Sequence, residues 1–208
     1  MKLYEFPPTR SIRVRWTLQE LGVPFESEQV RLPLGENRTP EFLKLNPAGK
    51  LPVLVDGDLV LNESVAIVLY LADKFPQKQL FPTALRERAE AYRWLLFAAT
   101  DLEQPLWRIA RNEFVYPEAE RVAADIPIAR HEARQAAGIV DAHLDGASFM
   151  VGERVSVVDF VMAYTLDWAE TAGCLDGCAS AKAYLERMYA RPQAALRITE
   201  ALQQAGIG

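Results

Sequence analysis

Strand and helix patterns alternate along the first third of the chain. An apolar-rich strand is predicted over residues 2–6, and apolar positions at helical spacing predict a helix over residues 12–21. Gly22 follows directly, and glycine is the residue that most often ends a helix in the left-handed conformation. A second strand is predicted over residues 25–30, and turns with a short helix over residues 40–45 come next. The pattern indicates an α/β domain at this end of the chain.

A β-hairpin and a further helix complete this domain. Two short apolar runs, residues 53–55 and 59–61, are separated by an Asp-Gly-Asp turn in which glycine tolerates a positive φ. The helix that follows opens with Asn62 or Ser64 as its expected N-cap. The full order is strand, helix, strand, helix, strand, strand, helix. This order resembles a thioredoxin-like domain, which is expected over residues 1–77.

Strand signals vanish after about residue 84, and long helical patterns take their place. One periodic segment covers residues 85–114, where Pro105 is expected to bend or interrupt the helix. Further helices are predicted over residues 127–144, from Ser156 onward, over residues 179–189 and over residues 193–204. The fold class is therefore α/β plus all-α, with the thioredoxin-like domain followed by an all-helical domain over residues 84–208.

Ser156 and Asp159 form the strongest local signal in the helical half. The Ser156 side chain can accept a hydrogen bond from the N–H of Asp159, whose carboxylate can reach back to the N–H of Ser156. This is a capping box with aspartate in the place of glutamate, and Val155 and Phe160 can close a hydrophobic staple over it. The predicted role of the box is in folding rather than in catalysis.

Composition and charge narrow the classes of function. The net charge of -5 gives a nucleic-acid partner no electrostatic support, and no apolar run approaches the roughly 18 residues of a membrane span. The two cysteines suggest no disulfide framework, so the cytoplasm is the expected compartment. His131 and His143 lack carboxylate or cysteine partners at ligand spacing, so no metal site is expected.

The stretch between residues 46 and 67 carries the chemistry of a peptide-binding site. A proline that starts a strand is a candidate for a cis peptide bond, and a cis Pro52 would expose the backbone N–H and C=O of Leu51 to an extended peptide. The helix start at Ser64 gathers free N–H groups that suit a carboxylate, and Glu63 stands beside it to meet an amino group. A ligand with peptide bonds, a free amine and carboxylates fits these features.

The same stretch reads NPxGKxP over residues 46–52 and LxESxAI over residues 61–67, where x is any residue. This pattern resembles the glutathione-binding half of the soluble glutathione transferase superfamily, in its bacterial-like form. The alternative is a plain hairpin followed by a helix, which would need neither the proline nor the Glu-Ser pair. The resemblance implies that glutathione is bound by Arg38, Lys50, Leu51, Pro52, Glu63 and Ser64, with Lys50 on its glycine carboxylate.

The resemblance also implies how the glutathione thiol is activated. In the family, a hydroxyl or thiol side chain in the loop after the first strand donates to the sulfur, and this chain offers Thr9 and Ser11 there. Thr9 is ranked first, although it can also be a solvated loop residue, because Ser11 can instead serve as the N-cap of the helix. Residues 1–173 contain no cysteine, which argues against the cysteine-type members. Arg10 and Arg13 would add positive potential near the sulfur, unless Arg13 faces solvent.

The second substrate is expected to be a small electrophile. Trp107, Arg108 and Arg111 form a cluster on the long helix that could accept an acidic or aromatic co-substrate, or could be a solvated face or part of a dimer surface. The resemblance implies a homodimeric glutathione transferase. Two alternatives stay open: another glutathione-dependent enzyme, such as an isomerase, peroxidase or disulfide reductase, and a non-catalytic binding or interaction module of the same fold.

Overall fold

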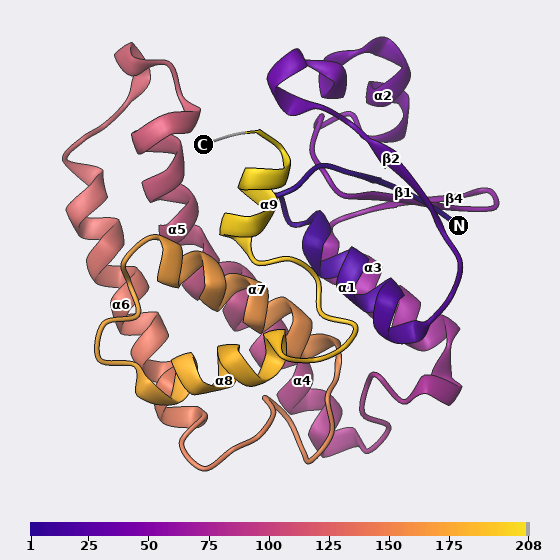
Figure 1. Cartoon of the computed structure of the whole chain (residues 1–208), viewed down its shortest axis with the longest axis vertical. Helices are drawn as coiled ribbons and strands as arrows, with labels where there is room; N and C mark the ends of the chain where they lie inside the picture. The colour runs from indigo at the N-terminus through magenta and orange to yellow at the C-terminus, as the bar shows by residue number, and fades with distance from the viewer. Residues whose placement is uncertain (207–208) are drawn as a thin grey trace. The chain divides into compact units, whose positions relative to one another are not determined.

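The chain forms two compact units in the computed structural model, which describes residues 1–206 (Figure 1). Residues 1–81 pack with residues 191–206 in unit 1, and residues 82–190 form unit 2. The chain therefore leaves unit 1 for unit 2 and later returns to unit 1. This differs from the expected division, which assigns the last residues of the chain to the helical domain.

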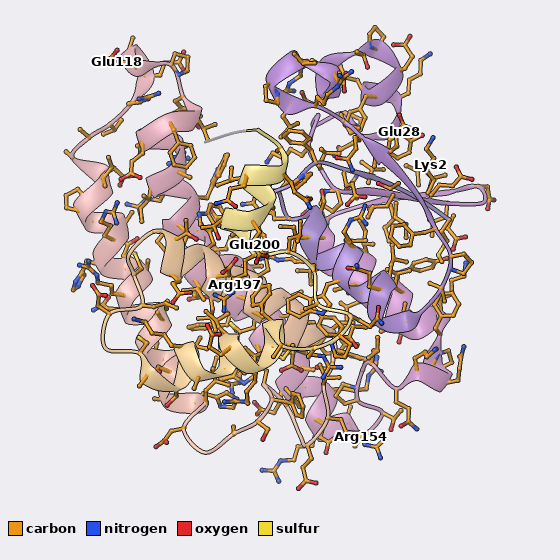
Figure 2. The ribbon with its side chains drawn as sticks, in the orientation of Figure 1. Lys2, Glu28, Glu118, Arg154, Arg197 and Glu200 are labelled. Atoms are coloured by element: carbon orange, nitrogen blue, oxygen red, sulfur yellow. The ribbon has the colours of Figure 1, made fainter. Side chains whose placement is uncertain are left out.

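Unit 1 is built on a four-stranded mixed sheet with the strand order β2-β1-β3-β4. Strand β2 runs parallel to β1, whereas β3 is antiparallel to both β1 and β4. The bounds are Lys2–Glu5 for β1, Glu26–Gln29 for β2, Val53–Asp56 for β3 and Leu59–Asn62 for β4. Lys2 on β1 and Glu28 on β2 form an ion pair of 3.0 Å, and both side chains are labelled in Figure 2. Gly57, with φ of 64°, makes the predicted hairpin turn.

The helices of unit 1 follow the predicted order. Helix α1 (Ser11–Leu21) packs against α3 (Ser64–Lys74), and the two lie side by side in Figure 1. Helix α2 (Pro40–Leu45) contributes Phe42 to a separate apolar cluster with Phe6, Val30, Leu51 and Val53, which we call the Phe42 cluster. One-turn 3-10 segments cover Leu32–Leu34, Glu36–Arg38 and Pro76–Lys78. The arrangement is that of a thioredoxin-like domain, as predicted.

Residues 191–206, which return to unit 1, are held to α1 by a bidentate ion pair. Arg191 donates to both carboxylate oxygens of Glu20, at 2.7 and 2.9 Å, and the Trp16 indole N–H donates to the same carboxylate at 3.2 Å. Helix α9 (Ile198–Gln204) begins later than the predicted helix, and the Glu200 carboxylate accepts the backbone N–H of Arg197 at its start, at 2.9 Å (Figure 2). Ala205 packs against the Phe42 cluster, so this segment completes the core of unit 1.

Unit 2 is helical, as predicted. Its α-helices are α4 (Leu85–Phe97), α5 (Glu103–Ala110), α6 (Asp125–His143), α7 (Val157–Thr171) and α8 (Ala179–Tyr189), and a 3-10 turn covers Glu118–Glu120. The predicted interruption near Pro105 is a π-helical turn, Ala98–Leu102, directly before α5. Pro105 has no N–H to give to a carbonyl of that turn, which explains the break. A second π-helical turn, Arg111–Val115, follows α5.

The capping box at α7 is confirmed, and it holds more than one helix. The Asp159 carboxylate accepts the backbone N–H of Ser156 at 2.8 Å, while the Ser156 hydroxyl accepts the N–H of Val158 at 3.3 Å. The same carboxylate accepts the N–H of Met150 at 2.8 Å and the hydroxyl of Tyr184 at 2.9 Å. Asp159 is fully buried, and its burial raises the pKa of the carboxyl group. This one side chain therefore joins α7, the preceding loop and α8.

Within residues 1–206, no helix combines the length and the apolar character that crossing a membrane requires.

Candidate functional site

The first turn of α3 is open to a ligand. The N-cap is Glu63, with φ of 69° and no side-chain capping bond, so the prediction that Asn62 or Ser64 caps this helix was wrong. Asn62 instead pairs with Val53 at the end of the β3–β4 ladder. Backbone N–H groups at a helix start that no side chain caps are ready to bind an anion. Within the described residues, the start of α3 therefore remains available to bind the predicted carboxylate.

Ser64 is held in place by a buried arginine from α1. Nη1 of Arg13 donates to the Ser64 hydroxyl oxygen at 3.1 Å, and the arginine is only 1% exposed. The sequence-based expectation placed Arg13 near the sulfur or in solvent. The structure instead buries it and connects it to the start of α3, across a sequence separation that no local pattern could indicate.

The loop before β3 presents the backbone of Leu51. The Leu51–Pro52 peptide bond is cis, as predicted. Asn46 orders the loop, because its side chain donates to the carbonyl of Lys50 at 2.8 Å and accepts the N–H of Ala48 at 3.1 Å. Within residues 1–206, the backbone N–H and C=O of Leu51 have no hydrogen-bond partner. An extended peptide could therefore pair with Leu51 as an added strand.

Asn37 and Arg38 brace the same loop from the side. The Asn37 amide donates to the carbonyl of Gly49 at 2.7 Å, and Nη1 of Arg38 lies 3.4 Å from the carbonyl of Ala48. Gly49 has φ of 62°, which favours glycine, and a Cβ atom there would also stand 3.0 Å from the backbone carbonyl oxygen of Asn37. Asn37 was missed by the sequence analysis, because only the fold brings its amide to this loop.

Two charged side chains of the predicted site are exposed. Lys50 lies beside Leu51, and Glu63 precedes Ser64. Neither forms an ion pair with any of residues 1–206. Their charges are therefore free to meet a carboxylate and an ammonium group of a ligand, in line with the predicted roles of both residues.

Thr9 and Ser11 act as a pair. Their hydroxyl oxygens are 2.6 Å apart, and the N–H of Phe6 lies 3.4 Å from the Ser11 hydroxyl oxygen. Helix α1 begins at Ser11, and its N-cap is Arg10 without a side-chain bond, so the reading of Ser11 as the N-cap was wrong. Ser11 is 1% exposed, whereas Thr9 is half-buried. One of the two hydroxyl groups donates to the other, which leaves one proton for a ligand atom.

A cavity of about 430 Å³ lies beside this hydroxyl pair, within unit 1. Ser11, Phe6 and Pro7 line one part of it, and Gln19 and Ala201 line another. None of the predicted glutathione contacts lines the cavity. The cavity and the Leu51 backbone are therefore separate features of unit 1.

The predicted electrophile cluster is partly occupied by its own neighbours. Nε of Arg108 donates to Asp125 at 3.0 Å, and the same guanidinium also forms an ion pair with Glu132. The hydrogen bond from Arg108 lowers the pKa of the Asp125 carboxyl group below its usual range. The Arg111 guanidinium stands over the ring of Tyr116, 5.8 Å from its centroid. A ligand anion would have to compete with two carboxylates, those of Asp125 and Glu132, for Arg108.

Residues 1–206 contain no group of three or more histidine, cysteine, aspartate or glutamate side chains placed to hold a metal ion. Cys174 and Cys178 are free and buried, and burial raises the pKa of both thiols. A raised pKa keeps a thiol protonated and unreactive at neutral pH.

Comparison with known proteins agrees with this fold. The family model "Glutathione S-transferase, N-terminal domain" matches residues 1–73, and "Glutathione S-transferase, C-terminal domain" matches residues 101–192. These matches define a thioredoxin-like domain followed by a helical domain, which is the class of protein that the fold indicates. The chain belongs to the glutathione S-transferase family, which is a family of transferases.

Individual relatives span most or all of the chain. Glutathione S-transferase GST-4.5 of Xanthomonas campestris pv. campestris is 33% identical over 100% of both chains. Glutathione S-transferase 1 of Dianthus caryophyllus is 36% identical over 78% of this chain and 74% of its own. The structure of a sphingomonad glutathione S-transferase complexed with glutathione has 26% identity and a TM-score of 0.82, and covers 100% of both chains.

Proposed function

We propose that the chain is a glutathione transferase of the serine or threonine type, which joins the thiolate of glutathione to a small electrophile. The observation that carries the proposal is the unpaired backbone of Leu51, which follows an ordered loop and stands beside a cis proline. This backbone can pair with the cysteinyl residue of glutathione as a short added strand. The relative with bound glutathione supports the choice of ligand.

The two ends of glutathione fit the charges on either side of Leu51. The γ-glutamyl end carries an amine and a carboxylate, which suit the exposed Glu63 and the open helix start at Ser64. The glycine carboxylate suits Lys50, with Arg38 as a second cation that contacts the same loop from the Glu36–Arg38 segment. Pro52 keeps Leu51 in the orientation that the added strand requires.

The hydroxyl pair of Thr9 and Ser11 is proposed to activate the glutathione thiol. A hydroxyl that donates to sulfur favours the thiolate over the thiol and so lowers the thiol pKa. Thr9 stays the first candidate, since it is the more exposed hydroxyl of the pair, and Ser11 is the second. The thiolate then attacks the electrophilic carbon, a carbon–sulfur bond forms, and the leaving group departs with its electron pair.

The electrophile is proposed to contact Trp107 and Arg111, with Arg108 as a supporting cation. A ring on the electrophile would stack on the tryptophan, and an acidic group would face the arginines. The free, buried thiols of Cys174 and Cys178 suit a reducing compartment, so a cytoplasmic location is part of the proposal. A panel of halogenated aromatics, peroxides and mixed disulfides would separate conjugation from peroxidase and reductase activity.

The proposal predicts that Ser64→Ala weakens glutathione binding by about 1–3 kcal/mol, because a charge-assisted hydrogen bond to the γ-glutamyl carboxylate is lost. Isothermal titration calorimetry measures the change. Ser148→Ala, which removes an exposed hydroxyl of unit 2, is the matched control and should bind as the unchanged protein does. If Ser64→Ala and the control bind glutathione with equal affinity, Ser64 does not bind the γ-glutamyl carboxylate. If neither the variants nor the unchanged protein binds glutathione, the proposed function is wrong.

The protein is also expected to form a homodimer that pairs unit 1 of one copy with unit 2 of the other. Exposed apolar side chains support this expectation: Leu59 and Val60 on β4, and Leu85, Tyr92 and Leu96 on α4. Light scattering at micromolar concentration should give twice the chain mass, and Leu96→Glu should shift the mass toward that of one chain. Ile139→Glu changes an equally apolar and exposed residue of α6 and should leave the mass unchanged. A monomer in the unchanged protein would rule the dimer out.

A further inference from the structure

The cavity of about 430 Å³ in unit 1 lies between helix α1, the end of β1 and residues 194–205 of the segment that returns to this unit. Its volume is in the range of roughly 300–1,000 Å³ that is typical of pockets for small molecules. Ser11 and Gln19 both line it, and they are eight residues apart, which is about 12 Å along α1 at 1.5 Å per residue. The part of the cavity beside Gln19 is therefore distant from the hydroxyl pair.

The charges in the wall of this cavity cancel each other. Glu5 and Arg15 are the charged residues that line it, and Nε of Arg15 donates to the Glu5 carboxylate at 2.8 Å. Glu5 is 2% exposed, and its carboxylate also accepts the hydroxyl of Ser27. A buried carboxylate with these donors needs no further partner from a ligand. The wall therefore suits a neutral ligand better than an ion, whose loss of water no free wall charge would offset.

One nitrogen of the Arg15 guanidinium is left without a partner. Nε and Nη2 donate to Glu5, and Nη2 also donates to the Ser27 hydroxyl at 2.9 Å. The guanidinium lies over the ring of Phe25, 5.4 Å from its centroid. Within residues 1–206, Nη1 has no hydrogen-bond partner. A guanidinium nitrogen can only donate, so the ligand atom that suits Nη1 is an acceptor such as a carbonyl oxygen.

The complementary acceptor belongs to Gln19. Its Oε1 atom is buried and has no hydrogen-bond partner within the described residues, so turning the amide toward a ligand in the cavity would break no hydrogen bond of this oxygen. Residues four apart lie on the same face of a helix, which places Arg15 and Gln19 beside the same ligand. Apolar side chains, among them Phe6, Ile12 and Leu196, form the other part of the wall.

We propose that this cavity binds a neutral, mostly apolar small molecule that carries a carbonyl and an adjacent N–H on one edge, as a lactam does. The carbonyl accepts from Nη1 of Arg15, and the N–H donates to the amide oxygen of Gln19. The apolar body of the ligand packs against Phe6 and Ile12. None of the proposed glutathione contacts lines the cavity, so the two ligands occupy separate sites. The inference does not depend on the proposed function.

Two probes test this site by isothermal titration calorimetry. The first, 2-quinolone, is a flat lactam with both groups on one edge, and the second, 1-methyl-2-quinolone, keeps the carbonyl but has no N–H. The unchanged protein should bind 2-quinolone about twofold to tenfold more tightly, the range for one neutral hydrogen bond. In Gln19→Leu this preference should vanish, because the acceptor is gone. Arg15→Lys keeps the charge beside Glu5 but loses the planar donor group, so it should weaken both probes by a similar factor.

The matched control is Gln203→Leu, which removes an exposed glutamine of α9 that does not line the cavity. It should bind both probes as the unchanged protein does. Ala194→Phe places a ring in the cavity and should abolish the binding of both probes, although Arg15 and Gln19 are intact. Circular dichroism checks that each variant folds. If Gln19→Leu does not fold, Ala194→Phe and the comparison of the two probes on the unchanged protein decide.

Several results would overturn the proposal. The unchanged protein would bind no 2-quinolone, or it would bind the two probes with equal affinity. Unaltered binding in Ala194→Phe would show that the probe lies outside the cavity, for example at Trp107. Saturating glutathione should leave the affinity for 2-quinolone unchanged, and displacement of the probe would place it in the glutathione site instead. A protein that binds 2-quinolone but no glutathione would refute the proposed function alone.

Discussion

Asp159→Ala is expected to lower the free energy of unfolding of unit 2 by roughly 3–5 kcal/mol, because each buried donor left without an acceptor costs about 1–3 kcal/mol. The carboxylate accepts hydrogen bonds from Met150, Ser156 and Tyr184, and alanine could replace none of them. The loss of the helix cap adds to this cost. Denaturation with urea, followed by circular dichroism, measures the change.

The control for this prediction is Asp145→Ala, which removes an exposed carboxylate from the same unit. It should change the stability by less than about 0.5 kcal/mol, as is usual for surface positions. If Asp159→Ala and the control unfold at the same urea concentration, the box contributes nothing to the stability of unit 2, and the prediction is wrong.

The pH dependence of this effect has a definite sign. Burial raises the pKa of the Asp159 carboxyl group above that of the unfolded chain, so the folded state favours the protonated form. The stability that this group contributes is complete below the ordinary carboxyl pKa of about 4 and is lost as the pH rises through the raised value. Asp159→Asn cannot ionise, so the stability advantage of the unchanged protein over this variant should shrink between acidic and neutral pH.

Loss of the hydroxyl pair is expected to have the largest effect on catalysis. Removing the donor to sulfur should raise the pKa of bound glutathione by about 1–2 units, since a hydrogen bond to a charged group contributes about 1.5–3 kcal/mol and one pKa unit equals about 1.4 kcal/mol. Because each pKa unit changes the thiolate fraction about tenfold, conjugation near neutral pH should slow by about tenfold to a hundredfold. Glutathione affinity should change little, because the rest of the tripeptide is held elsewhere.

The experiment compares Thr9→Ala with Ser11→Ala and follows the thiolate absorbance of bound glutathione against pH. The 2.6 Å contact between the two hydroxyl oxygens means that each variant also removes a partner of the other hydroxyl, so the double variant is needed. Ser148→Ala serves as the control. A shift in Ser11→Ala alone would reverse the ranking of the two residues. No shift in the double variant would leave activation to backbone N–H groups or arginines, and the hydroxyl hypothesis would be dropped.

Local chemistry explains what the sequence could predict. The hairpin follows from the Asp-Gly-Asp turn, the cis bond before Pro52 from its place at a strand start, and the capping box from Ser156 and Asp159. Each of these features depends on residues within a few positions of one another. Their signals are therefore present in any short window of the chain, and the structure confirms them.

The features that the sequence could not predict depend on distant contacts. Arg13 has the pattern of an exposed helix residue, and only the packing of α1 against α3 shows why it is buried. The caps of α1 and α3 were predicted wrongly because both serine hydroxyl groups have other partners: Ser11 contacts its near neighbours Thr9 and Phe6, and Ser64 accepts from the distant Arg13. Asn37 joins the site only because the fold places it beside Gly49.

The return of residues 191–206 to unit 1 has a consequence for the order in which the protein is made. Glu20 leaves the ribosome long before its partner Arg191, and all of unit 2 is synthesised between them. At about 5–20 residues per second, the first strands and helices of unit 1 therefore wait for seconds without the segment that carries α9. During that time the Phe42 cluster lacks its contact with Ala205, so unit 2 is expected to fold before unit 1 is complete.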